Sequence, residues 1–215
     1  MFQNKCSVNE FHCRRKIPLQ YESPIDQLLY YPSCIISKYL YWLLKKTNKD
    51  TYVKNGANIL TTISLILSLI GLYYIYIQKY TLGASLYFIG YLFDCCDGLY
   101  ARTFNVSTQF GDHYDHISDI IKILGFYIIL LTSSISKKNK IIFIIINIIT
   151  VPLGLWSFGC QQKLAKDNDS ESYILDKLKG LCSNSNNIYY SRYFSSGSWQ
   201  IIQFIFLIYL NYNKK

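Results

Sequence analysis

The sequence predicts an all-α fold: a polytopic membrane helix bundle of five or six transmembrane helices, preceded by an interfacial amphipathic helix. Three observations predict it. First, 51% of the residues are hydrophobic, and they gather into long runs separated by polar stretches. Second, several of these runs approach the roughly 20 residues that a helix needs to cross a bilayer. Third, the formal net charge is +9, and Lys and Arg crowd ahead of the first long run, as they do on the cytoplasmic side of membrane proteins.

The N-terminal part of the chain differs in composition from the rest. We expect residues 1–54 to be a cytoplasmic segment and residues 55–215 to be a transmembrane domain. The first residues are polar and lack the short apolar run of a signal peptide. Ser23 and Pro24 are typical of a helix start. The run 34–46 is too short to span and mixes apolar, aromatic and basic residues, so it predicts a helix lying in the membrane interface, with a core helix of a soluble cap as the alternative.

The apolar runs that follow are the expected spans. The four clearest cover residues 58–77, 82–102, 114–134 and 141–158. A polar stretch separates them from a last run, 198–212, which is short for a crossing. With the N-terminus inside, most Lys and Arg residues lie on the inner side, which favours that orientation although Lys137, Lys138 and Lys140 argue against it.

Cysteine content and charge bear on other classes of protein. The seven cysteines are odd in number and include no CxxC pair, so we expect neither a disulfide framework nor a zinc site. The positive charge alone would also suit a nucleic-acid binder. Because the long apolar runs favour a membrane protein instead, we expect no nucleic-acid partner.

Acidic residues are concentrated at one place in the apolar part. Five of the 13 acidic residues fall between positions 94 and 119, at the junction of the second and third expected spans. A carboxylate at membrane depth costs about 2.5 kcal/mol or more. Several together repel one another, so the cluster requires a cation, and hard carboxylate oxygens suit Mg²⁺ or Mn²⁺.

The spacing of these carboxylates predicts one shared site. Asp94 and Asp97 are three residues apart, and Asp115 and Asp119 are four apart, so each pair lies on one helix face. An antiparallel hairpin with a turn around residues 103–110 would bring the two pairs together. The predicted metal ligands are therefore Asp94, Asp97, Asp115 and Asp119.

Small residues and an arginine lie among the carboxylates. Gly98 and Ala101 would let a bulky, flat group approach the backbone. Arg102 carries a planar guanidinium suited to phosphate oxygens. Gly111 precedes Asp115 by one helical turn. These residues predict a site for a pyrophosphate-linked nucleotide, whereas small residues taken singly would indicate helix packing.

Taken together, these positions resemble the signature of the CDP-alcohol phosphotransferase (CDP-alcohol phosphatidyltransferase) family. The pattern that matches it at all eight positions is Asp94-x2-Asp97-Gly98-x2-Ala101-Arg102-x8-Gly111-x3-Asp115-x3-Asp119. The resemblance implies six transmembrane helices, often in a homodimer, with the active site facing the cytoplasm. In a eukaryote the membrane would be an internal one, such as that of the endoplasmic reticulum. It implies phospholipid synthesis, in which a substituted phosphate passes from a CDP-alcohol to a second alcohol and CMP is released.

The resemblance also implies roles for the motif residues. Asp94, Asp97 and Asp115 would hold Mg²⁺ or Mn²⁺, and Asp119 would be the general base and a further metal ligand. Gly98, Ala101, Arg102 and Gly111 would seat the cytidine nucleotide. Lys122, one turn after Asp119, would hold a lipid phosphate or extend towards the interface.

The substrates stay open at this point. The short chain favours CDP-diacylglycerol as donor and a small polar alcohol as acceptor, whereas the adjacent Asp115 and His116 favour CDP-choline or CDP-ethanolamine with diacylglycerol as acceptor. Two other classes also keep carboxylates for cations: metal-dependent prenyl transferases, and non-catalytic cation-binding membrane proteins. Release of CMP, of pyrophosphate, or of neither separates the three.

Overall fold

The computed structural model describes residues 12–165 and 177–213. This part of the chain is helical and contains no strand, which confirms the predicted all-α class. The first 11 residues of the predicted N-terminal segment lie outside it. Short 3-10 turns are η1 (Leu19–Tyr21), η3 (Lys177–Leu181), η4 (Ser185–Asn187) and η5 (Arg192–Phe194). The α-helices are α1 (Pro24–Lys45), α2 (Asp50–Lys54), α3 (Gly56–Tyr76), α4 (Tyr80–Thr103), α5 (Gln109–Thr132), α6 (Lys137–Leu164), α8 (Ile188–Ser191) and α9 (Ser196–Tyr212).

The long helices differ in how well they suit a membrane crossing. Within the described residues, α3 and α6 are long and apolar enough to span. Helices α4 and α5 have 24 residues each, or about 36 Å of helix, but they carry the acidic residues. Helix α9 has 17 residues. The structure thus supports two candidate spans directly, and the predicted total of five or six stays a prediction.

Helix α1 is longer than the interfacial run expected from the sequence. It begins after Ser23, whose side chain accepts a hydrogen bond from the Asp26 N–H, and it continues through Pro32 to Lys45. One face packs on α4, and the opposite face exposes an apolar stripe. The stripe consists of Leu28, Tyr31, Ile35, Tyr39 and Trp42. Such a stripe is what an interfacial helix presents, and that placement remains a prediction.

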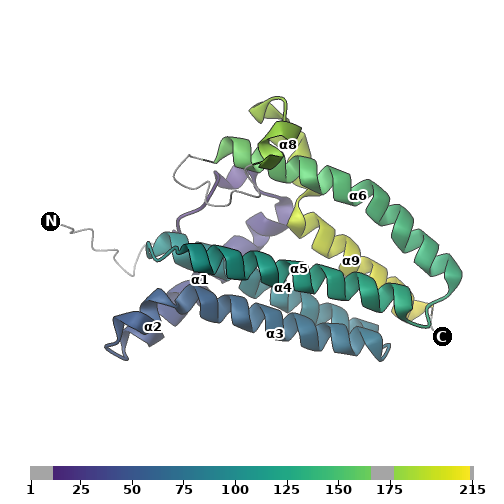
Figure 1. Cartoon of the computed structure of the whole chain (residues 1–215), viewed down its shortest axis with the longest axis horizontal. Helices are drawn as coiled ribbons and strands as arrows, with labels where there is room; N and C mark the ends of the chain where they lie inside the picture. Colours follow the sequence, from purple (N-terminus) through teal and green to yellow (C-terminus); the bar gives the residue numbers. More distant parts are fainter. Residues whose placement is uncertain (1–11, 166–176, 214–215) are drawn as a thin grey trace.

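Helices α3 and α4 pack closely because glycines lie between them (Figure 1). A Cβ atom added at Gly71 would lie 2.8 Å from the Tyr87 backbone nitrogen and 2.9 Å from the Gly83 carbonyl oxygen. One added at Gly90 would lie 2.3 Å from the Ser68 hydroxyl oxygen. Backbones that approach this closely are typical of membrane helix pairs with small residues at the contact. The contact fixes the position of α4 against α3.

Two disulfides show that the expectation of no disulfide framework was wrong. Cys13 bonds to Cys34, and Cys160 bonds to Cys182, across separations of 21 and 22 residues. The first joins the N-terminal segment to α1, and the second joins the residue that follows η3 to α6. Pairing depends on proximity in the fold, which the sequence spacing did not reveal.

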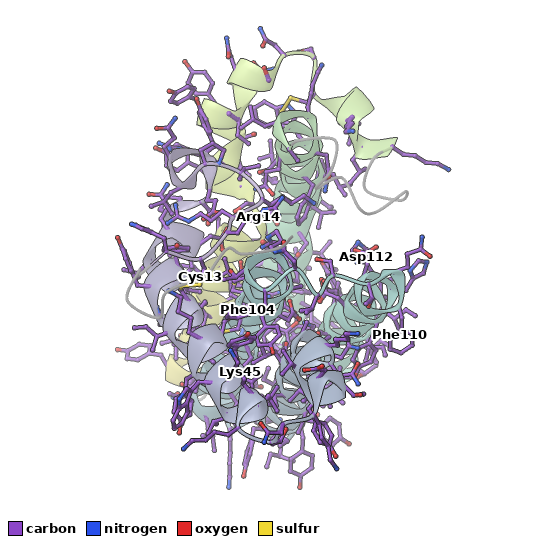
Figure 2. The ribbon with its side chains drawn as sticks, turned by 90° about the vertical axis from the view of Figure 1, so that its left-hand side faces the viewer. Cys13, Arg14, Lys45, Phe104, Phe110 and Asp112 are labelled. Atoms are coloured by element: carbon purple, nitrogen blue, oxygen red, sulfur yellow. A yellow bond between two sulfur atoms is a disulfide. The ribbon has the colours of Figure 1, made fainter. Side chains whose placement is uncertain are left out.

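The N-terminal segment also contacts the turn between α4 and α5. The Arg14 backbone N–H donates to the Thr103 hydroxyl over 3.0 Å, and the Arg14 guanidinium donates to the Asn105 side-chain oxygen over 3.3 Å. Asn105 has a φ of 52°, in the left-handed region that Asn tolerates, so the chain can reverse tightly there. Figure 2 views this end of the bundle, with Arg14 and Phe104 labelled. The turn sets the relative positions of the two acidic helices.

Candidate functional site

Three of the predicted metal ligands meet between α4 and α5. Asp94 and Asp97 lie on one face of α4, and Asp115 faces them from α5. Each offers a carboxylate oxygen, and these oxygens lie within 4.8 Å of one another. Asp97 is buried, and the other two are half-buried. The two helices therefore bring three carboxylates to one point.

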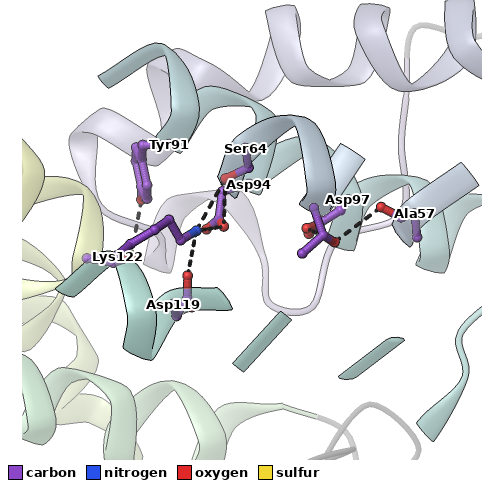
Figure 3. A network of polar contacts seen from close by, with 9 residues as sticks. Ala57, Ser64, Tyr91, Asp94, Asp97, Asp119 and Lys122 are labelled. Carbon is purple, nitrogen blue, oxygen red and sulfur yellow. Dashed lines mark hydrogen bonds and ion pairs between the residues drawn. The ribbon is translucent and has the colours of Figure 1, made fainter. Parts of the chain in front are cut away.

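Helix α3 supplies hydrogen bonds to these carboxylates, which the sequence analysis missed. The Thr61 hydroxyl donates to Asp97 Oδ2 over 2.6 Å. The Ser64 hydroxyl donates to Asp94 Oδ1 over 3.4 Å (Figure 3). These bonds orient the carboxylates of α4. The signal was present as a polar stripe, at helical spacing, on an otherwise apolar span: Asn58, Thr61, Ser64 and Ser68.

Lys122 lies inside the site instead of extending away from it. Its ammonium nitrogen is 2.5 Å from Asp94 Oδ1 and 2.7 Å from Asp119 Oδ1, and it also donates to the Ser64 hydroxyl over 3.2 Å (Figure 3). The lysine side chain is buried. Of the two roles considered from the sequence, extension towards the interface is not what the structure shows, because the ammonium pairs with two carboxylates.

Asp119 is placed beside the three-carboxylate group and linked to it through Lys122. It lies one helical turn after Asp115 on α5, and its side chain is 44% exposed. The structure thus brings Asp94, Asp97 and Asp115 together, whereas Asp119 pairs with the lysine. An exposed carboxylate next to the group can accept a proton from a molecule that enters the site.

The three-carboxylate group has the chemistry of a divalent metal site. Hard oxygen donors from several carboxylates suit Mg²⁺ or Mn²⁺. Asp115 Oδ1 is buried and has no hydrogen-bond partner among the described residues. A buried carboxylate oxygen without a partner is costly, and a cation at this point would satisfy it. The residues therefore fit such an ion.

The four residues predicted to seat a nucleotide line one cleft of about 90 Å³. Gly98, Ala101, Arg102 and Gly111 share this lining with Asp97 and Asp115. A Cβ atom added at Gly98 would lie 3.0 Å from the Arg102 guanidinium, and one added at Gly111 would lie 3.0 Å from the Asn58 side-chain oxygen. The glycines thus keep the cleft open beside the carboxylates.

His116 is directed to Asp112 instead of to the three carboxylates. Its Nδ1 lies 2.8 Å from the Asp112 carbonyl oxygen and 3.7 Å from the Asp112 carboxylate. Asp112 in turn is only partly exposed. The histidine thus contacts Asp112, which lines the same cleft, and it is not a member of the three-carboxylate group.

A larger, mainly apolar cavity of about 290 Å³ opens on the other side of the carboxylates. Asp94, Asp119 and Lys122 form its polar end. The remaining walls come mostly from α5, α6 and α9. The carboxylates thus lie between the small cleft lined by Gly98 and Arg102 and an apolar cavity.

Comparison with known protein families identifies a match. A family model described as CDP-alcohol phosphatidyltransferase matches residues 54–181, a stretch that contains all four aspartates of the site. No curated protein and no solved structure matches the chain.

Proposed function

The chain belongs to the CDP-alcohol phosphatidyltransferase family, and on that premise we propose that it transfers a substituted phosphate from a CDP-linked alcohol to an acceptor alcohol. This family is membrane-integral, generally uses divalent metal ions and makes phospholipids. The observation that carries the proposal is the group of three carboxylates with oxygens within 4.8 Å, next to a cleft lined by Gly98 and Arg102.

The proposed reaction is a displacement at the β-phosphorus of the CDP-alcohol. The acceptor oxygen forms a new bond to that phosphorus, and the bridging P–O bond to the α-phosphate breaks. CMP leaves with the electron pair of that bond. The acceptor hydroxyl loses its proton to Asp119, which we assign as the general base because its half-exposed carboxylate lies beside the three others.

Asp94, Asp97 and Asp115 are the residues that would hold the Mg²⁺ or Mn²⁺ ion. When bound, such an ion neutralises charge on the pyrophosphate and on the departing CMP. Thr61 holds Asp97 through its hydroxyl, and Ser64 and Lys122 hold Asp94, so these two carboxylates keep their positions from one turnover to the next.

The nucleotide cleft would bind the cytidine diphosphate portion. Gly98, Ala101 and Gly111 leave room for it, and the Arg102 guanidinium offers donors to phosphate oxygens. As the resemblance implies, Asp119 would also contact a second metal ion beside Asp94, Asp97 and Asp115. The family further leads us to propose a multi-pass homodimer, with this cleft on the cytoplasmic side.

The test is an assay of purified protein with cytidine-labelled CDP-diacylglycerol, CDP-choline and CDP-ethanolamine, each with its matching acceptor and Mg²⁺ or Mn²⁺. We expect release of CMP that stops when a chelator is added. Release of pyrophosphate from a prenyl diphosphate, without CMP from any CDP-alcohol, would support a prenyl transferase. Bound cation with neither product would support a non-catalytic protein.

A further inference from the structure

The apolar cavity beside the carboxylates is continuous with a groove along the side of the bundle. The cavity of about 290 Å³ reaches Tyr127 and Val151. These two residues also line a neighbouring groove of about 520 Å³, which continues to Leu131 on α5 and Ile144 on α6. From Asp119 to Leu131 the helix rises about 18 Å. A long space therefore runs from the proposed base along α5 and α6, the helices labelled in Figure 1.

The groove is open to the surroundings of the protein along its length. Val151 and Leu155, on α6, are 41% and 42% exposed, and Ile148 is 67% exposed. These exposed side chains are apolar, and α6 is one of the two candidate spans. In a membrane this side of the helix faces hydrocarbon, so a lipid can enter the groove without crossing water.

The surface that the lining presents to the cavity is mainly apolar. Among the described residues of the cavity, the one cation is Lys122, and it already pairs with Asp94 and Asp119. Three buried polar atoms of this lining have no partner in the described chain: Tyr87 Oη, Thr150 Oγ1 and Gln200 Oε1. Three such atoms can hydrogen-bond a glycerol backbone or its ester carbonyls. They are too few to replace the water around a polyol, and the described lining residues offer no unpaired cation to a phosphorylated alcohol.

The position of Asp119 decides which substrate occupies this space. A general base must reach the hydroxyl it deprotonates, directly or through one water molecule. Asp119 lines the apolar cavity, whereas the nucleotide cleft is lined by Asp97 and Asp115. The acceptor hydroxyl must therefore arrive through the apolar cavity.

We propose that the acceptor is an uncharged lipid alcohol of the diacylglycerol class, held in this groove with its free hydroxyl at Asp119. This inference rests on the proposed function and narrows it. The donor is then a water-soluble CDP-linked small alcohol, and the acyl chains of the product already lie on the membrane side of the protein when CMP leaves.

The first experiment compares two substrate pairs with the purified protein in detergent and lipid. One pair is CDP-choline or CDP-ethanolamine with diacylglycerol, and the other is CDP-diacylglycerol with serine, inositol or glycerol phosphate. We expect CMP release and lipid product from the first pair only. Turnover of the second pair alone overturns the inference and leaves the proposed function standing. Absence of CMP from every pair overturns both.

The second experiment fills the groove. Val151→Trp places an indole in the space shared by the cavity and the groove, so we expect the KM for diacylglycerol to rise about tenfold while the KM for the CDP-alcohol is unchanged. Ile149→Trp is the matched control, since Ile149 is 58% exposed on α6 and lies outside both linings. An unchanged KM for diacylglycerol in Val151→Trp, or a selective rise for the CDP-alcohol, contradicts the inference.

Discussion

The α3–α4–α5 part of the molecule and the α6 side differ in how closely they are packed. Between α3 and α4, an added Cβ at Gly71 would meet backbone atoms at 2.8 Å, whereas at Gly154 on α6 the nearest atom would be 3.4 Å away. In the most apolar stretch of α3, 39% of the residues are buried, whereas 17% are buried in the corresponding stretch of α6. The difference fits two requirements of the proposed reaction: the carboxylates must keep fixed positions, and the proposed lipid acceptor needs space to enter.

The largest effect on turnover should come from the α3–α4–α5 part, at the proposed base Asp119. We predict that Asp119→Asn lowers kcat by about 10³-fold, because the amide cannot take the acceptor proton. Binding of the CDP-alcohol should be retained, since Asp119 lies outside the nucleotide cleft. Turnover and nucleotide binding, measured on the same preparation, check this prediction. Asp50→Asn on the exposed end of α2 is the control, and normal turnover in Asp119→Asn would remove this residue as the base.

Removing the buried ammonium group of Lys122 should destabilise the same part of the protein. We predict that Lys122→Met lowers the free energy of unfolding by about 3 kcal/mol, because Asp94 and Asp119 lose the ammonium that pairs with them. Added Mg²⁺ should raise the melting temperature of this variant more than that of the wild type. Thermal unfolding in detergent measures both effects. An unaltered melting temperature, with Lys54→Met as the exposed control, would show that the lysine does not stabilise the site.

A matched pair of glycine substitutions compares the packing of the two parts directly. We predict that Gly71→Ala destabilises the protein by about 2 kcal/mol, because its methyl group would collide with the α4 backbone. Gly154→Ala should change stability by less than about 0.5 kcal/mol, since its methyl group would make an ordinary contact. The midpoints of thermal or denaturant unfolding decide the matter, and equal effects would remove the distinction between the two parts.

A pH-dependent effect concerns the N-terminal segment, which packs against the α3–α4–α5 part. Burial raises the pKa of Glu22 to about 7, although Arg15 opposes the shift. A folded-state pKa above that of the unfolded chain means that the protonated form stabilises the fold, and this contribution is lost as the pH rises through about 7. We therefore predict that Glu22→Gln melts higher than the wild type at pH 8 and at the same temperature near pH 4. A constant difference across this range, with Asp50→Asn as control, would show that Glu22 is solvated.

The helices and the three-carboxylate group could be predicted from the sequence, because helical spacing determines which residues share a face. Spacings of three and four residues place Asp94 with Asp97 on one face, and a short turn reverses the chain between α4 and α5. Helix α5 packs on α3, and there Asp115 faces the first pair. The roles assigned to these residues, and to Gly98, Ala101, Arg102 and Gly111, remain predictions.

Features that depend on distant contacts were not predictable in this way. Lys122 has two carboxylate partners, and one of them, Asp94, is 28 residues away in the sequence, on another helix. The disulfides join cysteines that share no local motif. The apolar groove depends on where α6 runs relative to α5, which hydropathy does not specify. The polar stripe on α3 could have been found from its spacing, because hydroxyl groups recur there every three or four residues.

The pairing of Lys122 with Asp119 bears on how the chain is assembled. Both residues belong to α5, three positions apart, so the helix carries a counter-ion for one of its own acids. An internal ion pair presents less net charge to hydrocarbon than an isolated carboxylate, which lowers the cost of inserting this segment during synthesis. On the prediction that α5 spans the bilayer, it can enter before it packs on α3, and Lys122 can add Asp94 as its second partner once α4 and α5 face each other.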